Sequence, residues 1–415
     1  MIEATGNDVT VSRSTRQAAR APLARNLRHL RLFLEVARSH SLTVASSRCH
    51  VSQPAVTQAI GKLETQAEGV LFTRTSHGFY STERGEALVR RVERVFAMLD
   101  PALADISPRL IATATISQLE ALIAVCESEN FTLAAKRLGL AQPTVHRAVA
   151  QLEHEATRPL FERTSFGVVA GRACLALARA AHLAFYELQQ ASAELAELEG
   201  RDEGTVVIGS LPLARSVLLP RALVRFRAER PSMRVTVHDG LYDVFLSGLR
   251  RGEIDFMIGA LRDPPPINDV VQEALFDDRL VIVARLDHPL ARLRAVGIED
   301  LVDYPWIVPR PGTPSRAQFD ALFAQSGPST SPHVMEAGSI LLMREMLRQS
   351  DHLGCVSGQQ AQAEIANGLL ARIDATVRWP ARAIGLTMRS EWQPTGAQRR
   401  LIDIVREEAS RLEPL

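Results

Sequence analysis

Two polar runs in the N-terminal half of the chain contain the side-chain types that contact base pairs in DNA. The first run holds Gln53, Ala55, Thr57 and Gln58, and the second holds Gln142, Thr144, His146 and Arg147. Glutamine pairs bidentately with adenine, a hydroxyl bonds a base edge or a phosphate, and an alanine or threonine methyl contacts the thymine methyl. Each run opens with Gln-Pro, and proline is tolerated in the first turn of a helix. Both runs therefore predict an exposed helix N-terminus suited to the major groove.

The two runs belong to an internal duplication with a constant offset of 89 residues. The register holds without a gap from Leu30 and Leu119 to Gly78 and Gly167, and about 19 of the 49 aligned positions are identical. Chance would match only a few positions. The repeat therefore predicts two copies of one structural unit in a single chain.

Each copy is predicted to form three helices followed by a hairpin. Apolar residues give the third helix a buried face, at Val56, Ile60 and Leu63 in the first copy and at Val145, Val149 and Leu152 in the second. Thr43 and Thr132 are placed to act as N-caps of the second helix. Each copy ends in Leu-Phe-x-Arg-Thr-Ser and a glycine, which predicts a wing whose Arg74 or Arg163 reaches a phosphate. The second wing is expected to be about three residues shorter, ending before Gly171.

Further predicted DNA contacts lie within or beside the two runs. They are Thr43, Ser52, Pro54, Lys62 and Pro143. Net charge is +5 over residues 1–110 and −3 over residues 111–200, so the first copy offers phosphates the more basic surface. The alternative for either copy is a plain three-helix interaction module, such as a dimerisation domain, and the sequence leaves open whether both copies touch DNA.

A long helix is predicted after each wing, from Gly85 to about Ala104 and from Arg172 to Glu199. Apolar residues recur at heptad spacing in both, at Leu88, Val92, Val95, Leu99 and Ala102, and at Cys174, Leu177, Ala181, Ala184, Leu188, Ala191, Leu195 and Leu198. Seams of this kind pair helices, either with a second chain or within the chain's own core, and the second seam is the longer.

The C-terminal half alternates between short apolar runs and helical segments. Strands are predicted at 205–209, 234–238, 256–259, 280–284, 306–308, 354–356 and 383–387. Strands separated by helices indicate parallel sheets covered on both faces, and ligands bind beyond the carboxyl ends of such strands. The predicted fold class is therefore mixed, with two all-α helix-turn-helix domains followed by an α/β domain.

The first copy closely resembles the winged helix-turn-helix of LysR-type transcriptional regulators. The resemblance is carried by Leu42-Thr43-Val44-Ala45, Val51-Ser52-Gln53-Pro54-Ala55-Val56-Thr57-Gln58, Leu63-Glu64 and Leu71-Phe72-Thr73-Arg74. Having the motif twice is unusual. The sequence also departs from the family, because Glu68 and Thr157 stand where it usually has a glycine, and Ala141 and His146 replace hydroxyl residues.

The segments from Leu249 to Gly259 and from Asp287 to Ala291 resemble the effector domain of the same family, which is similar to two-lobed periplasmic binding proteins. Gly259 to Pro264 weakly resembles the galactose-binding-protein regulator subgroup, which hints at a sugar or small organic acid. The resemblance implies effector contacts from loops after strands, at Ser210, Leu211, Gly259, Ala260, Leu261, Arg262, Pro311, Gly312, Thr313 and Ser339. Tyr242 replaces a small hydroxyl residue often found after the second strand, which argues against a simple carboxylate clamp.

The resemblance implies a domain plan for the whole chain. A disordered tail over 1–25 precedes the first winged helix-turn-helix and its helix (26–106), the second with its linker helix (107–200) and an effector domain (203–415). Lobe I is expected at about 203–284 and 380–415, and lobe II at about 285–379. The implied partners are double-stranded DNA, a small-molecule effector, further copies of the chain in a dimer or tetramer through the linker helices, and RNA polymerase.

Other classes of protein lack support in the sequence. There is no G-x-S-x-G elbow, phosphate loop or H-E-x-x-H, and no cofactor or metal is expected. The cysteines Cys49, Cys126, Cys174 and Cys355 form no C-x-x-C pair and favour buried thiols in a bacterial cytoplasm. An enzyme or a transported-solute binding protein is a remote alternative. The nearer alternative is a regulator whose C-terminal half binds no effector and only mediates oligomerisation. Operator, effector identity and the sign of regulation are not encoded in any motif.

Overall fold

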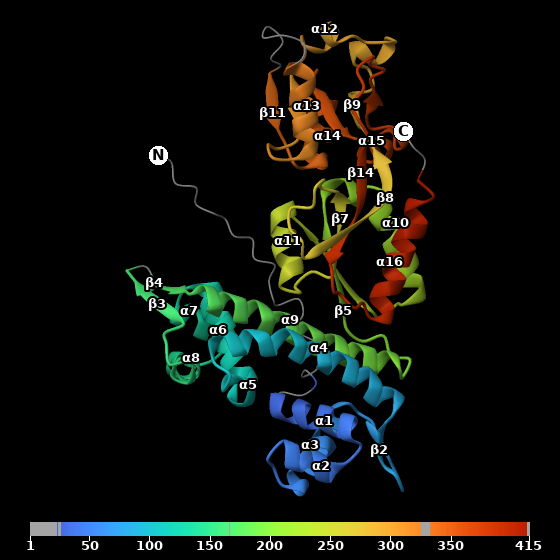
Figure 1. Cartoon of the computed structure of the whole chain (residues 1–415). Coiled ribbons are helices and arrows are strands. Elements are labelled where there is room, and N and C mark those ends of the chain that lie inside the picture. Colours follow the sequence, from blue (N-terminus) through green and yellow to red (C-terminus); the bar gives the residue numbers. More distant parts are fainter. Residues whose placement is uncertain (1–22, 24–25, 166, 325–332, 413–415) are drawn as a thin grey trace. The chain divides into compact units, whose positions relative to one another are not determined.

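The computed structural model describes residues 23, 26–165, 167–324 and 333–412, so most of the tail expected over 1–25 lies outside the described residues. The chain divides into two compact units, one reaching Thr205 and including 250–253, and the other formed by 206–249 and 254–415. Figure 1 shows helices dominating the first unit and two sheets in the second. In the described parts of the chain, none of the helices combines the length and hydropathy needed to cross a bilayer.

The first unit contains the same fold twice. The first copy comprises α1 (Leu27–Ser39), α2 (Leu42–Arg48), α3 (Gln53–Gln66), β1 (Phe72–Thr75), β2 (Gly78–Ser81) and α4 (Glu83–Ile106). After the short α5 (Leu110–Thr113), the second comprises α6 (Ile116–Ser128), α7 (Phe131–Leu138), α8 (Gln142–Ala156), β3 (Phe161–Thr164), β4 (Gly167–Ala170) and α9 (Arg172–Glu197). Each hairpin pairs antiparallel, and both copies confirm the predicted tandem winged helix-turn-helix.

Left-handed backbone positions also recur at the offset of 89 residues. They are His40 and Glu129, His50 and Gly139, Glu68 and Thr157, and Gly78 and Gly167. At Gly78 a Cβ would lie 2.4 Å from the carbonyl oxygen of His40, and the neighbouring amide of Phe79 donates to that oxygen at 2.9 Å. Gly167 approaches Glu129 in the same way. The wing is therefore docked on the end of the first helix, where only glycine fits.

Two local expectations were wrong. Ser41 and Asn130, not Thr43 and Thr132, cap the second helices: the Ser41 hydroxyl accepts from the amide of Val44, and the Asn130 side chain accepts from two amides. The two wings are also equal in length, because α4 begins at Glu83 and not at Gly85. Gly85 instead lies in the first turn of α4, where a Cβ would strike the Leu71 carbonyl oxygen.

The long helices α4 and α9 pack against each other within one chain. Ion pairs join Arg84 to Glu199, Arg91 to both Glu187 and Glu194, Arg90 to Glu194 and Arg94 to Glu187. Early residues of α4 meet late residues of α9, so the helices run antiparallel, and Figure 1 shows them side by side. The heptad residues of both helices belong to one hydrophobic core that includes both copies, apart from the half-buried Ala102, which packs against it, and Leu198, which is exposed beyond the end of α9. Both seams are thus largely buried inside the chain.

The second unit contains two five-stranded sheets. The first has the order β6 (Arg234–Asp239), β5 (Thr205–Ser210), β7 (Phe256–Ala260), β14 (Arg382–Arg389) and β8 (Val270–Asp278), and its helical elements are η2 (Pro212–Arg215), α10 (Leu218–Glu229), α11 (Tyr242–Arg250) and α16 (Gly396–Ala409). The second has the order β11 (Val334–Glu336), β10 (Trp306–Val308), β12 (Leu353–Ser357), β9 (Leu280–Ala284) and β13 (Ala371–Arg372). Its helical elements are η3 (Pro289–Arg292), α12 (Ile298–Leu301), α13 (Pro314–Ala324), α14 (Ile340–Arg348) and α15 (Gly358–Ala366).

This architecture confirms the α/β two-lobed class, but it corrects two details. The sheets are mixed rather than parallel, since β14 pairs antiparallel with β7 and β8, and β9 pairs antiparallel with β12 and β13. The strand Leu280–Ala284, assigned to lobe I, belongs to the second sheet because β12 and β13 take up its hydrogen bonds. The chain therefore changes lobe between Asp278 and Leu280, and not at residue 284.

The left-handed residue after α8 generates a stability prediction. Thr157 has φ 53° at the helix C-cap, and a β-branched side chain is strained there by about 1–2 kcal/mol. Glycine removes that strain but gains entropy in the unfolded chain. We expect Thr157→Gly to stabilise this unit by about 0.5–1 kcal/mol in urea unfolding.

Gly139, the left-handed C-cap of α7, offers the opposite control, because it has φ 67° and open space around it. Gly139→Ala should destabilise by about 1 kcal/mol. If Thr157→Gly were as destabilising as Gly139→Ala, the backbone argument would be wrong.

Candidate nucleic-acid interface and effector site

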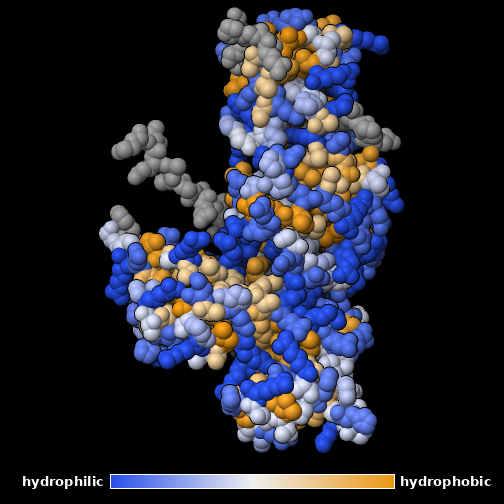
Figure 2. Space-filling model, in the orientation of Figure 1, coloured by the Kyte–Doolittle hydropathy of each residue, from blue (hydrophilic) through white to orange (hydrophobic). Residues whose placement is uncertain are grey.

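The N-terminal ends of α3 and α8 present the two predicted reading surfaces. Their inner faces are buried through Val56, Ile60 and Leu63, and through Val145, Val149 and Leu152. The predicted contact residues Thr43, Ser52, Gln53, Pro54, Thr57, Gln58, Lys62, Gln142, Pro143, Thr144, His146 and Arg147 are exposed, while Ala55 is half-buried. Figure 2 shows a largely hydrophilic surface over the first copy, with hydrophobic residues scattered among polar ones.

Most of these polar side chains have no task within the described chain. Among the described residues, the side chains of Gln53, Gln58 and Arg147 take part in no hydrogen bond or ion pair, whereas most other arginines are paired. Thr57 is partly engaged, because its hydroxyl donates to the Gln53 carbonyl oxygen at 3.2 Å. The His146 ring packs 5.3 Å from the ring of Phe131. Side chains ordered on a helix but left without partners are available to a nucleic acid.

The residues that the two wings share have a structural role. The Glu64 carboxylate accepts from the amides of Leu71 and Phe72 at 2.9 and 3.4 Å. In the second copy, Glu153 accepts from the amides of Leu160 and Phe161 at 2.8 and 3.3 Å. The Leu-Glu motif thus fixes the entry to the hairpin. Arg74 and Arg163 project from these hairpins and are exposed.

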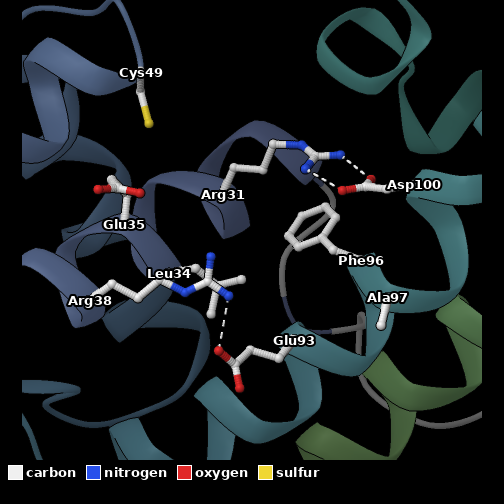
Figure 3. Close-up of a pocket in the computed structure, with 9 residues that line it drawn as sticks. All are labelled: Arg31, Leu34, Glu35, Arg38, Cys49, Glu93, Phe96, Ala97 and Asp100. Atoms are coloured by element: carbon white, nitrogen blue, oxygen red, sulfur yellow. Dashed lines mark hydrogen bonds and ion pairs between the residues drawn. The ribbon is translucent and has the colours of Figure 1, made fainter. Parts of the chain in front are cut away.

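At two aligned positions each reading unit contacts its own long helix, and the acidic residue lies on the long helix in the first copy and on the reading unit in the second. In the first copy, Arg38 of α1 pairs with Glu93 of α4 at 3.0 Å, and Arg31 binds Asp100 through both nitrogens while stacking on Phe96 (Figure 3). The aligned residues of the second copy, offset by 89, are Glu127 of α6 and His182 of α9, which lie 2.6 Å apart.

The ion cluster between α4 and α9 is the most buried charge in this unit. The side chains of Arg91 and Glu187 are 5% and 2% exposed and lie 2.9 Å apart. Burial alone lowers the pKa of Arg91, but Glu187 and Glu194 outweigh it, so the pKa lies above the ordinary arginine value. The guanidinium is therefore charged in the folded protein.

In the effector domain, predicted residues of the first lobe come together at the carboxyl ends of β5 and β7. These neighbouring strands are parallel, and the amide of Leu211 donates to the carbonyl oxygen of Ile258 at 2.9 Å. The side chain of Leu211 covers Gly259, where a Cβ would lie 2.3 Å from it. Ser210, Gly259 and Ala260 are buried, while Leu261 is half-buried. This end of the sheet is thus closely packed around small residues.

Arg262 lies near this edge, and its side chain extends toward the second lobe. Its guanidinium carbon lies 4.8 Å from the centre of the Tyr242 ring, and one of its nitrogens lies 3.5 Å from the Gly312 carbonyl oxygen. The Gln272 side chain holds the backbone of Arg262 through two hydrogen bonds. Among the described residues, the buried Tyr242 hydroxyl has no hydrogen-bond partner. Burial raises the pKa of that hydroxyl, which keeps it protonated as a donor.

The predicted residues of the second lobe have local structural tasks. The Thr313 hydroxyl accepts from the amide of Arg316 and donates to the Arg310 carbonyl oxygen. Ser339 caps α14 by accepting from the amide of Leu342 at 3.3 Å. Pro311 and Gly312 are exposed on the same loop. Arg310, not predicted, lies against Gly338 beside the Ser339 cap.

Sequence reasoning missed a buried ion pair where the chain passes between the lobes. Arg382 at the start of β14 pairs with Asp278 at the end of β8 at 3.1 Å, and both side chains are under a tenth exposed. Asp278 also accepts from the Ser357 hydroxyl and the Gln359 amide, both at 3.2 Å. Arg382 further bonds Ser315 of the second lobe. No local motif could reveal this cluster, because its members are far apart in sequence.

Comparisons with known families agree with this geometry. Residues 199–410 match the LysR substrate binding domain. Residues 27–86 and 116–175 each match the bacterial regulatory helix-turn-helix protein of the lysR family. The duplicated motif is therefore recognised twice.

Similar proteins of known type are transcriptional regulators. The chain is 35% identical over 376 residues to the HTH-type transcriptional regulator GalR of Pseudomonas putida, covering 88% of this chain and 92% of GalR. It is 32% identical over 264 residues to the RuBisCO operon transcriptional regulator of Acidithiobacillus ferrooxidans, covering 64% and 84% of the two chains. A full-length OxyR variant from Pseudomonas aeruginosa has the same fold, with a TM-score of 0.51, 20% identity and coverage of 71% and 94%.

The glutamate that holds the first wing generates a second prediction. Glu64→Ala leaves two partly buried amides without an acceptor, which costs about 1–3 kcal/mol. We expect a lower urea midpoint and a loss of DNA affinity, because Arg74 is no longer held in place. Glu64→Gln keeps an acceptor oxygen and should behave nearly as the parent. Equal stability of Glu64→Ala and the parent would contradict this role.

Proposed function

Because the chain belongs to the LysR family of bacterial transcriptional regulators, we propose that α3 and α8 both enter the major groove and that a small organic anion binds between the lobes of its effector domain. The protein is a sequence-specific DNA-binding transcriptional regulator controlled by a small-molecule effector. It acts through binding rather than catalysis, in the bacterial cytoplasm where the chromosome lies. The finer assignments below concern the residues involved.

One observation carries the DNA-reading proposal. Both Gln-Pro helix ends expose unengaged polar side chains while the opposite faces of the same helices are buried. Gln53 and Gln142 suit adenine, and Arg147 suits guanine, each through paired hydrogen bonds. Lys62, Arg74 and Arg163 are placed to neutralise phosphates, while Thr43 and Ser52 offer hydroxyls to the backbone.

The effector proposal rests on Arg262 and Tyr242. A guanidinium stacked on an aromatic ring, beside a buried hydroxyl that lacks a partner, offers a bidentate donor and a second donor to one anionic group. Ser210 lies at the same edge, at the carboxyl end of β5. We expect the Tyr242 hydroxyl to act as the donor in place of the small hydroxyl residue that Tyr242 replaces, so this donor set favours a carboxylate over a neutral sugar, contrary to the expectation from sequence.

We propose a two-state mechanism in which effector binding draws the lobes together. Asp278 and Arg382 lie where the chain crosses between the lobes, so their ion pair is placed to preserve the hinge during closure. A ligand shifts this equilibrium only by its differential affinity for the two states. The altered lobe geometry then changes how the readers are held on their operator.

Gln53→Ala tests the reading assignment. It should lower affinity for the specific operator by about 1–3 kcal/mol and leave affinity for random duplex unchanged, because a base contact is lost. Fluorescence anisotropy at fixed salt measures both. The matched variant Lys62→Ala should weaken both duplexes equally, because it removes a phosphate contact. A Gln53→Ala variant that weakens both duplexes equally would show that Gln53 does not read bases.

Arg262→Ala tests the effector assignment. In thermal-shift measurements against small carboxylates and monosaccharides, the parent chain should rise in melting temperature with a carboxylate. Arg262→Ala should bind that carboxylate about 10- to 100-fold more weakly, since a charge-assisted hydrogen bond is lost. Arg372→Ala, a change of an exposed arginine on β13, serves as the control.

Two outcomes would oppose this assignment. A carboxylate that binds Arg262→Ala as tightly as the parent would move the site elsewhere. A domain that responds to no compound would favour the alternative of a C-terminal half that only mediates oligomerisation.

A further inference from the structure

The two reading units are joined inside one chain as equivalent halves. Helices α4 and α9 occupy the same place in the repeat, run antiparallel, and bury the same aligned seam positions, including Leu88 with Leu177 and Val95 with Ala184. Two equivalent helices that pack antiparallel through the same face are related by an approximate two-fold axis. A single chain therefore has the internal geometry that otherwise requires a pair of subunits.

The buried charges specify the pairing of α4 with α9 over self-pairing of either helix. Glu187 lies against Arg91 and Arg94 of α4, whereas the aligned positions of α9 are Ala180 and Leu183. In a symmetric α9–α9 pair, a carboxylate only 2% exposed would face Ala180 and Leu183 with no cation. An α4–α4 pair would place Arg91 against Met98 in place of Glu187, with Asp105 in place of Glu194. The α9–α9 pairing leaves a buried carboxylate uncompensated, which is strongly unfavourable, and the α4–α4 pairing deprives Arg91 of its buried partner.

The two reading helices differ at the positions that face outward. Gln53 and Pro54 recur as Gln142 and Pro143, but Ala55, Thr57 and Gln58 are replaced by Thr144, His146 and Arg147. The shared glutamine favours the same base in both half-sites. At the end of the run, the amide of Gln58 favours adenine and the guanidinium of Arg147 favours guanine.

We propose that one chain reads a non-palindromic operator, with α3 on one half-site and α8 on a different half-site, joined by the α4–α9 pair. This proposal rests on the proposed DNA-reading function. Two identical readers related by a two-fold axis require a palindromic operator. Two unlike readers related by a similar axis require an operator whose half-sites have unlike sequences. Further copies of the chain then associate through surfaces other than the α4–α9 seam.

Selection from a random duplex library by the full-length chain tests the proposal. The expected site has two unlike halves. Arg147→Gln should change the preferred base in one half only, and Gln58→Arg in the other half only, each with a roughly 5- to 150-fold loss on the parent site. A palindromic site, or a substitution that changes both halves alike, would overturn the proposal. A chain that selects no sequence at all would instead refute the DNA-reading function.

A mixing experiment distinguishes a complex in which one chain supplies both readers from a complex in which two chains supply one reader each. Gln53→Ala and Gln142→Ala each weaken one reader, so each variant alone should bind the selected operator weakly. If one chain supplies both readers, an equimolar, refolded mixture of the two variants binds no better than the stronger variant. Recovery of parental affinity in the mixture would show that α3 and α8 on an operator come from different chains, and the proposal would fail.

Discussion

The burial of α4 against α9 is the constraint on which the N-terminal unit depends. One hydrophobic core extends from the first reading copy through both helices into the second, so neither reader can be placed independently of that contact. The Arg91–Glu187 pair within it is costly to desolvate, and a hydrophobic substitute of the same shape could be as stable. What the pair contributes is specificity: only the pairing of α4 with α9 brings Arg91 and Glu187 together, and an α9–α9 pair leaves the buried Glu187 without a cation.

The sequence predicted the repeated unit well because aligning the two copies shows which residues occupy equivalent positions. The Gln-Pro helices, their buried faces and the wings all followed from aligned residue types. The N-cap predictions were wrong because Ser41 and Thr43 both carry hydroxyls, and only the backbone conformation decides which hydroxyl accepts a hydrogen bond from an amide. The predicted difference in wing length was wrong because the first long helix was expected to begin at Gly85, whereas the residue that aligns with Gly171 is Thr82.

In the effector domain, local signals located strands but not their partners. Short apolar runs identify β5, β7 and β9, yet sheet membership is decided by hydrogen bonds to strands far along the chain. Hence the strand after Arg279 was placed in the wrong lobe, and the polar, alternating β8 was overlooked. The contacts of the candidate effector site were equally hidden from local sequence signals. Arg262 followed a recognisable strand, but its stacking on Tyr242 and the Asp278–Arg382 pair arise only from the folded topology.

The two copies can diverge from each other because they lie in one chain. In a homodimer every substitution appears twice, so a charge that suits one subunit must also suit the other. Within a fused pair, each copy keeps a fixed neighbour, and complementary changes can accumulate on one side alone. Arg38 with Glu93 and, at the aligned positions, Glu127 with His182 show such a change, because the acidic residue has moved from the long helix to the reading unit. The same freedom extends to the exposed reading faces, where Gln58 and Arg147 now differ while the buried residues beneath them remain alike.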